Sequence, residues 1–157
     1  MHHDMRNAER HGTALGQVLE LAVLMNADMT QSLARDGLTV ARAHLLWELH
    51  HRGPSTQRIL AQVLDVSPRN ITGLVDGLVA TGFVTREPHP TDRRATLVSF
   101  TEHGARAAKE MDEGRAQLAE LLFSGMSDRR FNGLVVGLGA VLDRLKEELS
   151  EERGKRP

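Results

Sequence analysis

Hydrophobic residues recur at steps of three and four along most of the chain, which is the spacing that places side chains on one face of an α-helix. The longest such stretch covers residues 10–36 and ends at Asp36-Gly37, where glycine favours a helix stop. The pattern therefore predicts a long amphipathic first helix. Its apolar face consists of Leu15, Val18, Leu19, Ala22, Met25, Met29 and Leu33.

Three shorter helices are predicted next, and each follows a polar residue whose side chain can accept a hydrogen bond from the first turn. Thr39 precedes the first of them, Thr56 the second and Ser67 the third. A Gly-Pro pair after residue 52 ends the first of these helices. Pro68 suits the first position of the third, because the N–H that proline lacks has no partner there in any helix.

A short hairpin interrupts the helical pattern. Gly82 favours the left-handed conformation that ends the preceding helix. Residues 83–86 are then typical of a strand, and residues 96–100 of its return strand. Pro88 and Pro90 lack the N–H that a sheet ladder needs, so we expect them at the tip or the edge of this hairpin.

Two more amphipathic helices are predicted after the hairpin. Thr101 can cap the first, which continues to about residue 123, and Ser127 can cap the second. We expect residues 10–36 and 101–150 to form a dimer interface, because their apolar faces are more extensive than one compact core needs. The alternative is that they pack only within their own chain. Residues 151–157 are polar and are expected to be a frayed tail.

The length of 157 residues suits one domain, and the fold class that the pattern predicts is mainly α with one small two-stranded hairpin. The chain has no cysteine, which excludes disulfides and thiolate zinc sites. No apolar run approaches the roughly 18 residues that span a bilayer, and the N-terminus lacks the apolar core of a signal peptide. We therefore expect a soluble, cytoplasmic protein without a membrane partner.

Charge changes this picture little. The formal net charge is −1, and residues 54–101 hold five Lys and Arg against four Asp and Glu, the only positive balance along the chain. A protein that covers DNA without sequence preference depends on neutralising phosphates with many cations. Composition by itself therefore does not indicate a nucleic-acid binder, and it disfavours non-specific DNA compaction.

The order of elements between residues 39 and 101 is that of a winged helix-turn-helix. Two short helices joined by the tight turn "LDVS" are followed at once by a hairpin. In this motif the second helix places its N-terminal residues in the major groove of DNA. The hairpin, or wing, reaches the adjacent minor groove, whose negative potential attracts arginine.

This part of the sequence resembles the MarR (multiple antibiotic resistance regulator) family. The match rests on the turn "LAQVLDVS" and on a wing in which Asp92, Arg94, Val98 and Thr101 fit the family pattern, with Phe100 where leucine is usual. The element order fits across nearly the whole chain. The resemblance implies a homodimeric transcription regulator of double-stranded DNA, usually a repressor that a small aromatic or phenolic ligand releases. No cofactor is expected.

The wing tip carries three candidate DNA contacts. By the resemblance, Arg94 enters the minor groove and Asp92 orients it as an ion-pair partner. We interpret the neighbouring Arg93 as a phosphate contact. The alternative is a solvated turn in which Asp92 caps its own backbone. A dimer presents two such lobes, so its operator is expected to be a pseudo-palindrome with half-sites one helical turn apart.

The third short helix carries the candidate base contacts. Arg69 and Asn70 lie in its first turn and off its apolar face, where they can reach guanine or adenine edges. Thr72 suits a phosphate or a thymine methyl group. Asp76 is expected to pair with an arginine, and Gly73 stands where the family often has a larger polar residue, which puts base contact there in doubt. Other candidates lie near helix starts, which suit backbone phosphates; they are Ser55, Thr56, Gln57, Arg58, Ser67 and Pro68.

A ligand pocket is a further hypothesis. In similar proteins the effector lies between the dimerisation helices and the DNA-binding lobe. Met25 and Met29 on the first helix, with Trp47 and His51 on the second, are the candidates here, since methionine adapts to apolar shapes and aromatic rings supply walls with a polar handle. The alternative is that Met and Trp at helical spacing belong to a plain core.

Two other classes of function are disfavoured. Some relatives sense zinc, but the one close pair of ligand types is His44 with Glu48, so a metal would need His, Asp and Glu from several helices. An enzyme would need a nucleophile–base arrangement or a glycine-rich phosphate loop, and the sequence shows neither. A metal-responsive regulator and a non-specific DNA-compacting dimer remain the alternatives to a ligand-released repressor.

Overall fold

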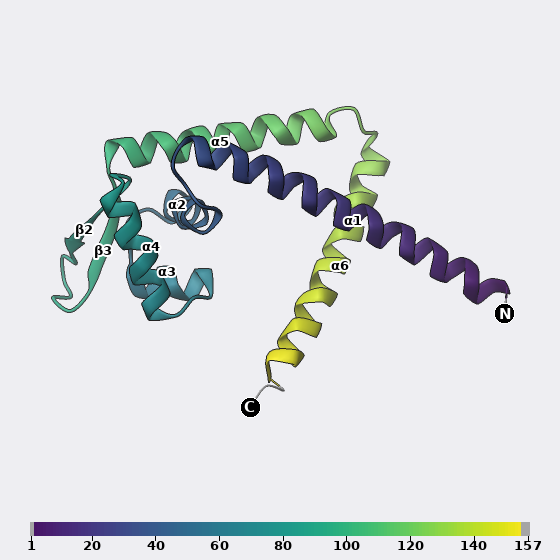
Figure 1. Ribbon diagram of the computed structural model, residues 1–157, viewed down its shortest axis with the longest axis horizontal. Coiled ribbons are helices and arrows are strands. Elements are labelled where there is room, and N and C mark those ends of the chain that lie inside the picture. Colours follow the sequence, from purple (N-terminus) through teal and green to yellow (C-terminus); the bar gives the residue numbers. More distant parts are fainter. Residues whose placement is uncertain (1, 155–157) are drawn as a thin grey trace. The chain divides into compact units, whose positions relative to one another are not determined.

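The computed structural model describes residues 2–154, with the side chains of residues 5–152, and these divide between two compact units, up to residue 112 and from residue 113. The fold is mainly α-helical with one small sheet, which confirms the predicted fold class (Figure 1). In chain order the elements are α1 (His2–Arg35), α2 (Val40–Arg52), β1 (Ser55–Thr56), α3 (Gln57–Leu64), α4 (Pro68–Ala80), β2 (Val84–Pro88), β3 (Thr96–Phe100), α5 (Glu102–Phe123) and α6 (Asp128–Gly154).

The predicted helix caps are confirmed. Thr39 Oγ1 accepts a hydrogen bond from Arg42 N at 3.3 Å, which opens α2. Each cap satisfies one of the backbone N–H groups that a helix start leaves without an internal partner. The same bond is made by Thr56 to Ile59, Ser67 to Asn70, Thr101 to Gly104 and Ser127 to Arg130.

Two predicted boundaries differ from the structure. Helix α1 begins at His2 rather than near residue 10, and it ends at Arg35 as expected. Helix α6 continues to Gly154, so residues 151–154 are helical rather than part of a frayed tail. Residues 155–157, the rest of that predicted tail, lie outside the described residues.

The sheet has three antiparallel strands in the order β1-β3-β2, so the prediction of a two-stranded hairpin missed one strand. Strand β1 is only two residues long, and it pairs Ser55 with Val98 of β3. Strand β2 begins at Val84, one residue later than predicted, and extends to Pro88. Because β2 is an edge strand, the N–H that Pro88 lacks costs no ladder bond inside the sheet.

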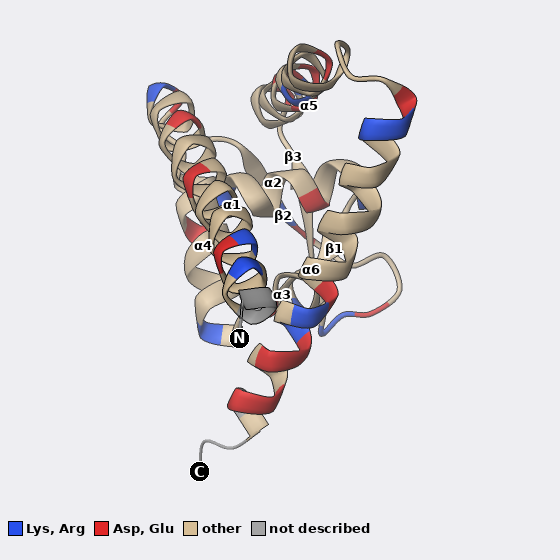
Figure 2. Cartoon of the chain, turned by 90° about the vertical axis from the view of Figure 1, so that its right-hand side faces the viewer, with Lys and Arg blue, Asp and Glu red and all other residues tan. Residues whose placement is uncertain are grey.

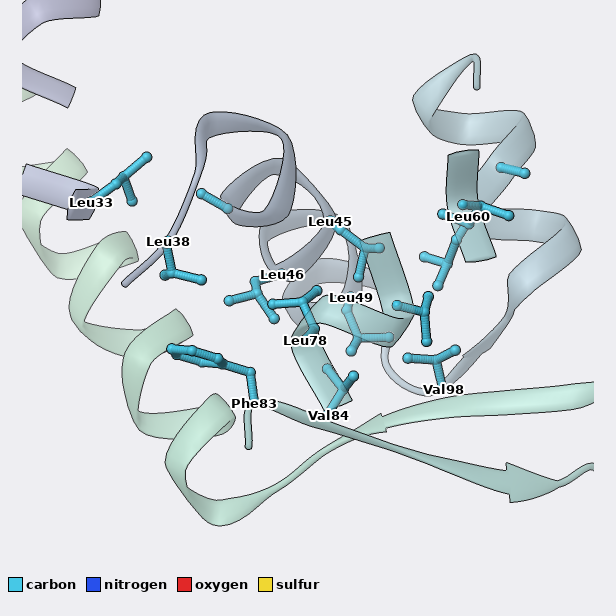
Figure 3. Packing of buried hydrophobic residues seen from close by; sticks show 14 residues of the cluster. Leu33, Leu38, Leu45, Leu46, Leu49, Leu60, Leu78, Phe83, Val84 and Val98 are labelled. Carbon is cyan, nitrogen blue, oxygen red and sulfur yellow. The ribbon is translucent and has the colours of Figure 1, made fainter. Parts of the chain in front are cut away.

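The hydrophobic core of the first unit lies between α2, α3, α4 and the sheet (Figure 3). Burial of each leucine removes apolar surface from water and contributes roughly 1.5–3 kcal/mol. Helix α1 adds Leu33 to this cluster, and Leu38 follows it. The largest side chains that are fully buried are Leu45, Leu46, Leu49, Leu60, Val75, Leu78, Val84 and Val98.

Most of the predicted apolar face of α1 is exposed in the single chain. The side chains of Leu15, Leu19 and Met25 are 59%, 57% and 45% exposed. In the second unit, α6 shows the same feature, and its residues 131–142 carry no charged side chain. Figure 2 shows long stretches of both helices in tan, the colour of residues other than Lys, Arg, Asp and Glu. The exposed apolar residues of α6 are Phe131, Val135, Val136, Val141, Leu142, Leu145 and Leu149.

Within the described residues, none of these helices is both long enough and apolar enough to cross a membrane.

Candidate DNA-binding interface

A sharp turn joins α3 to α4. Asp65 follows the last residue of α3 in the left-handed conformation, at φ 52° and ψ 47°. Aspartate tolerates this region better than most residues with a side chain. The N–H of Val66 then donates to Ala61 O at 3.0 Å, which satisfies a carbonyl at the end of α3. The turn is thus built by local bonds, and α4 begins at Pro68 directly after the Ser67 cap.

The first turn of α4 is exposed on one side and anchored on the other. Ile71, Val75 and Leu78 are buried in the core, so they fix the inner face of the helix. Arg69 and Asn70 are exposed, as are Ser67, Pro68 and Thr72. The residues that we expected to contact bases therefore lie outside the core, at the end of α4 that a recognition helix presents to the major groove.

The wing tip is ordered by its own hydrogen bonds. His89 Nδ1 accepts from the backbone N–H groups of Thr91 and Asp92, at 3.2 and 3.1 Å. Asp92 Oδ1 accepts from the backbone N–H of Arg94 at 3.0 Å. This is the local backbone cap that the alternative interpretation of the turn predicts, and the orientation of the Arg94 side chain by Asp92 stays a prediction. Arg93 and Arg94 are exposed beside it.

The predicted phosphate contacts around β1 separate into two groups. Ser55 is only 7% exposed, and its hydroxyl donates to Gly53 O at 2.9 Å. Because β1 pairs with β3, this hydroxyl is turned inward, and the phosphate contact by Ser55 stays a prediction. Thr56 is half-buried and caps α3. Gln57 is also half-buried, whereas Arg58 is exposed.

A hollow of about 710 Å³ lies between the start of α3 and the wing. Arg58 lines it from α3, and Arg94 lines it from the wing. Two cations and one carboxylate, that of Asp92, therefore face one open surface next to the first turn of α3. A polyanion that follows this surface meets positive charge from both elements.

One residue of this region was missed by the sequence. Arg86, on β2, pairs with Asp76 of α4, and its Nη2 lies 2.5 Å from Asp76 Oδ1. The expectation that Asp76 pairs with an arginine is thereby confirmed. No spacing signal in the sequence marks Arg86 as its partner, because the two residues lie on different elements and only the packing of β2 against α4 brings them together.

The predicted ligand-binding residues do not line a described cavity. Met25 and Met29 are 45% and 43% exposed on α1. Trp47 is half-buried on α2, and the ring of His51 packs against it with the ring centroids 4.1 Å apart. Of the two hollows described, one lies beside the wing and the other on α5, and neither includes these four residues.

The histidines form no metal cluster in the part of the chain that the structure describes. His44 Nε2 lies 3.8 Å from Glu48 Oε1, and Glu48 also accepts from Arg52 Nε at 3.0 Å. A structural metal site needs three or four ligands around one point. Among the side chains described, those of residues 5–152, no group of three or more His, Asp and Glu has that arrangement.

Comparison with known proteins identifies the family. The family model described as "MarR family" matches residues 38–96, which cover α2, α3, α4 and most of the wing. The HTH-type transcriptional repressor NicR of Pseudomonas putida is 32% identical over 114 residues, which are 72% of either chain. The chain belongs to the MarR family. This MarR-family chain is therefore a DNA-binding transcriptional regulator and not an enzyme.

Two further comparisons extend the match beyond the winged lobe. The HTH-type transcriptional repressor YetL of Bacillus subtilis is 29% identical over 132 residues, 82% of this chain and 78% of YetL. The crystal structure of Streptococcus pneumoniae FabT in complex with DNA superposes with a TM-score of 0.74 at 18% identity, over 88% of this chain and 97% of FabT. At this identity the structural likeness shows the fold alone, which is the MarR-like winged-helix fold with further helices N-terminal and C-terminal to the lobe in the sequence.

Proposed function

We propose that this MarR-family regulator is a homodimeric, sequence-specific repressor that inserts α4 into the major groove and the wing tip into the adjacent minor groove. The observation that carries the proposal is that Arg69 on α4 and Arg94 in the wing are both exposed. The buried sides of α4 and of the wing strands pack in the same hydrophobic core. A helix can contact base edges in the major groove, and arginine is attracted to a narrow minor groove. NicR and YetL, both described as repressors, support this sign of regulation.

The exposed apolar faces support a dimer. Leu142 and Leu145 on α6 are 52% and 54% exposed, as are comparable leucines on α1. Monomeric proteins rarely leave so many large apolar side chains on one helix face, and such faces mark protein–protein contacts. A second copy that covers them removes this surface from water. It also presents two α4 helices, which fits half-sites about 34 Å apart.

Release by a small aromatic ligand is the further part of the proposal, and it rests on the family. The pair formed by Trp47 and His51 offers an aromatic surface with a polar atom, although His51 Nδ1 is already 2.9 Å from Trp47 O. A ligand releases DNA only when it binds the non-binding arrangement of the two lobes more tightly than the binding one. A roughly hundredfold loss of operator affinity needs on the order of 2.7 kcal/mol of such coupling.

The test is a titration of the purified chain against labelled duplexes at one fixed salt concentration. The DNA immediately upstream of its own gene is compared with random duplex of equal length, and sedimentation gives the mass of the free protein. We expect a dimer that binds the upstream DNA about a thousandfold more tightly than random DNA. Equal affinity for both duplexes contradicts the proposal and favours the non-specific DNA-compacting dimer.

A second duplex controls for geometry. Insertion of about five base pairs between the two half-sites turns one of them to the opposite side of the helix, since a turn holds about ten. A dimer with two fixed α4 helices then engages only one half-site. Unchanged affinity for this duplex contradicts the dimeric mode of binding.

A further inference from the structure

The guanidinium of Arg86 connects three elements of the lobe. Its Nε donates to Gln57 Oε1 at 2.8 Å, which ties β2 to the first residue of α3. Its Nη2 donates to Asp76 Oδ1 at 2.5 Å and to the carbonyl oxygen of Thr72 at 3.4 Å. Thr72 and Asp76 lie one turn apart on α4. Arg86 therefore holds two successive turns of the recognition helix from its polar side.

A fourth bond closes this network. Gln57 Nε2 donates to Thr72 Oγ1 at 3.4 Å, while Thr72 Oγ1 itself donates to Pro68 O at 2.9 Å. The first residue of α3 and the first turn of α4 are thus joined directly as well as through Arg86. The inner face of α4 is fixed by apolar contacts, which are not directional. The hydrogen bonds on its outer face are directional, so they define the rotation of α4 about its own axis.

The chemistry of arginine suits this role. Its guanidinium is planar and presents five donors in a fixed geometry, whereas the lysine ammonium is a compact point charge on a flexible stem. Only arginine can donate from Nε and Nη2 in two fixed directions at once. The Arg86 side chain is 31% exposed and that of Asp76 is 60% exposed, and ion pairs this accessible contribute little to folding. The network therefore contributes orientation more than stability.

We propose that Arg86 is a positioning residue that determines operator specificity, by holding the angle between α4 and the wing. This rests on the proposed function, because it assumes that α4 and the wing contact adjacent grooves of one half-site. With the angle fixed, Arg69 and Arg94 meet their grooves together. Without the fixed angle, Arg69 and Arg94 can each still contact DNA. They then no longer contact one half-site simultaneously, so specificity for the operator sequence is lost.

The rival role for Arg86 is a direct phosphate contact, and the two roles predict opposite results. A phosphate contact depends on charge, so lysine replaces arginine well and glutamine lowers the salt dependence of binding by about one counterion. A positioning residue depends on geometry, so lysine fails although the charge remains. Asp76→Asn separates the two roles further. It removes a negative charge beside DNA and frees Arg86 for a phosphate, so the phosphate role predicts tighter binding. It also breaks the hydrogen-bond network, so the positioning role predicts weaker operator binding.

The first experiment measures binding of Arg86→Lys and Asp76→Asn to operator and random duplexes across a range of salt concentrations. For both variants we expect at least a tenfold loss of operator affinity. Random-DNA affinity and salt dependence are expected to stay unchanged in Arg86→Lys, which keeps its charge. Arg52→Lys is the matched control, because Arg52 pairs with Glu48 at 3.0 Å on α2, away from the candidate interface. Wild-type behaviour of Arg86→Lys, equal losses on both duplexes, or tighter binding by Asp76→Asn overturns the proposal.

A second experiment tests positioning without an operator. The chain has no cysteine, so Asn70→Cys with Arg93→Cys accepts spin labels at α4 and the wing tip only. Pulsed electron resonance on the free protein is expected to give a narrow distance distribution that broadens on Arg86→Lys and stays narrow on Arg52→Lys. An unchanged distribution on Arg86→Lys overturns the positioning role. Failure of the wild type to discriminate between duplexes, with the broadening present, instead contradicts the proposed function alone.

Discussion

The carbonyl oxygen of Phe83 lies 1.8 Å from the position that a Cβ atom on Gly104 would occupy. The same oxygen accepts from the backbone N–H of Thr101 at 3.1 Å and from its hydroxyl at 3.2 Å. The hydroxyl of Thr101 also donates to Gly82 O at 2.6 Å. The end of α4, the start of β2 and the first turn of α5 therefore meet at one point, where hydrogen bonds connect the wing directly to the start of α5.

We expect Gly104→Ala to destabilise the chain. The added methyl group overlaps a backbone carbonyl, that of Phe83, which accepts two hydrogen bonds from Thr101. Such overpacking costs roughly 1–3 kcal/mol in the free energy of unfolding. Urea denaturation measures the change. Gly73→Ala is the control, because nothing lies within 4 Å of a Cβ there and alanine favours a helix interior by about 0.5–1 kcal/mol. Equal stability of the two variants contradicts the close approach.

Arg94→Ala is expected to weaken operator binding by roughly 1–3 kcal/mol and to leave folding intact, because it removes a groove contact and no core contact. Arg94 is exposed, and its backbone N–H bond to Asp92 survives the substitution. Fluorescence anisotropy gives the affinity, and thermal unfolding checks the fold. Arg106→Ala, another exposed arginine but on α5, is the control. If the operator affinity of Arg94→Ala equals that of the wild type, the proposed groove contact by Arg94 is contradicted.

Base contacts and phosphate contacts are expected to respond differently to mutation. Arg69→Ala and Asn70→Ala change preference at defined operator positions, since they lie in the exposed first turn of α4. Arg58→Ala weakens binding to all sequences about equally and lowers the salt slope by about one. Binding to a library of operator variants at several salt concentrations measures both effects. Loss of affinity without a change of preference in all three variants means that α4 does not contact the bases.

The dimer prediction concerns α6. Leu145→Glu places a charge on an apolar face that we expect to be covered by a second copy, so it shifts the sedimentation mass towards the monomer and lowers operator affinity. Lys146→Glu, the next residue on the same exposed helix, makes the same side chain at a position that is already polar. The two variants are compared at equal protein concentration. A dimeric Leu145→Glu variant contradicts the interface.

The effector prediction uses Trp47, the single tryptophan of the chain. A phenolic acid such as salicylate is expected to change Trp47 fluorescence and to lower operator affinity at the same ligand concentration. Benzoate and an aliphatic acid of similar charge control for the phenol and for charge alone. A fluorescence change without loss of DNA binding shows a site that does not control DNA binding, and no response to aromatic acids contradicts an aromatic effector.

Local features of this protein are determined by its sequence. The caps at Thr39, Thr56, Ser67 and Thr101 each join residues three apart, so a side chain and the N–H that it binds are close in any helical start. The turn before α4, the positive φ of Gly82 and the return strand β3 follow from residues that are neighbours in the chain. These features were sufficient to predict a winged helix-turn-helix.

Contacts between distant segments were decided only by the tertiary structure. Strand β1 has two residues, too few for a period of hydrophobic positions, and it exists because β3 pairs with it and turns Ser55 inward. Arg86 reaches Gln57 across 29 positions, and Phe83 meets Gly104 across 21. Sequence patterns show which face of a helix or strand is apolar. Which residue a polar side chain will contact depends on how the elements pack together, and neighbouring residues in the sequence carry no signal for that packing.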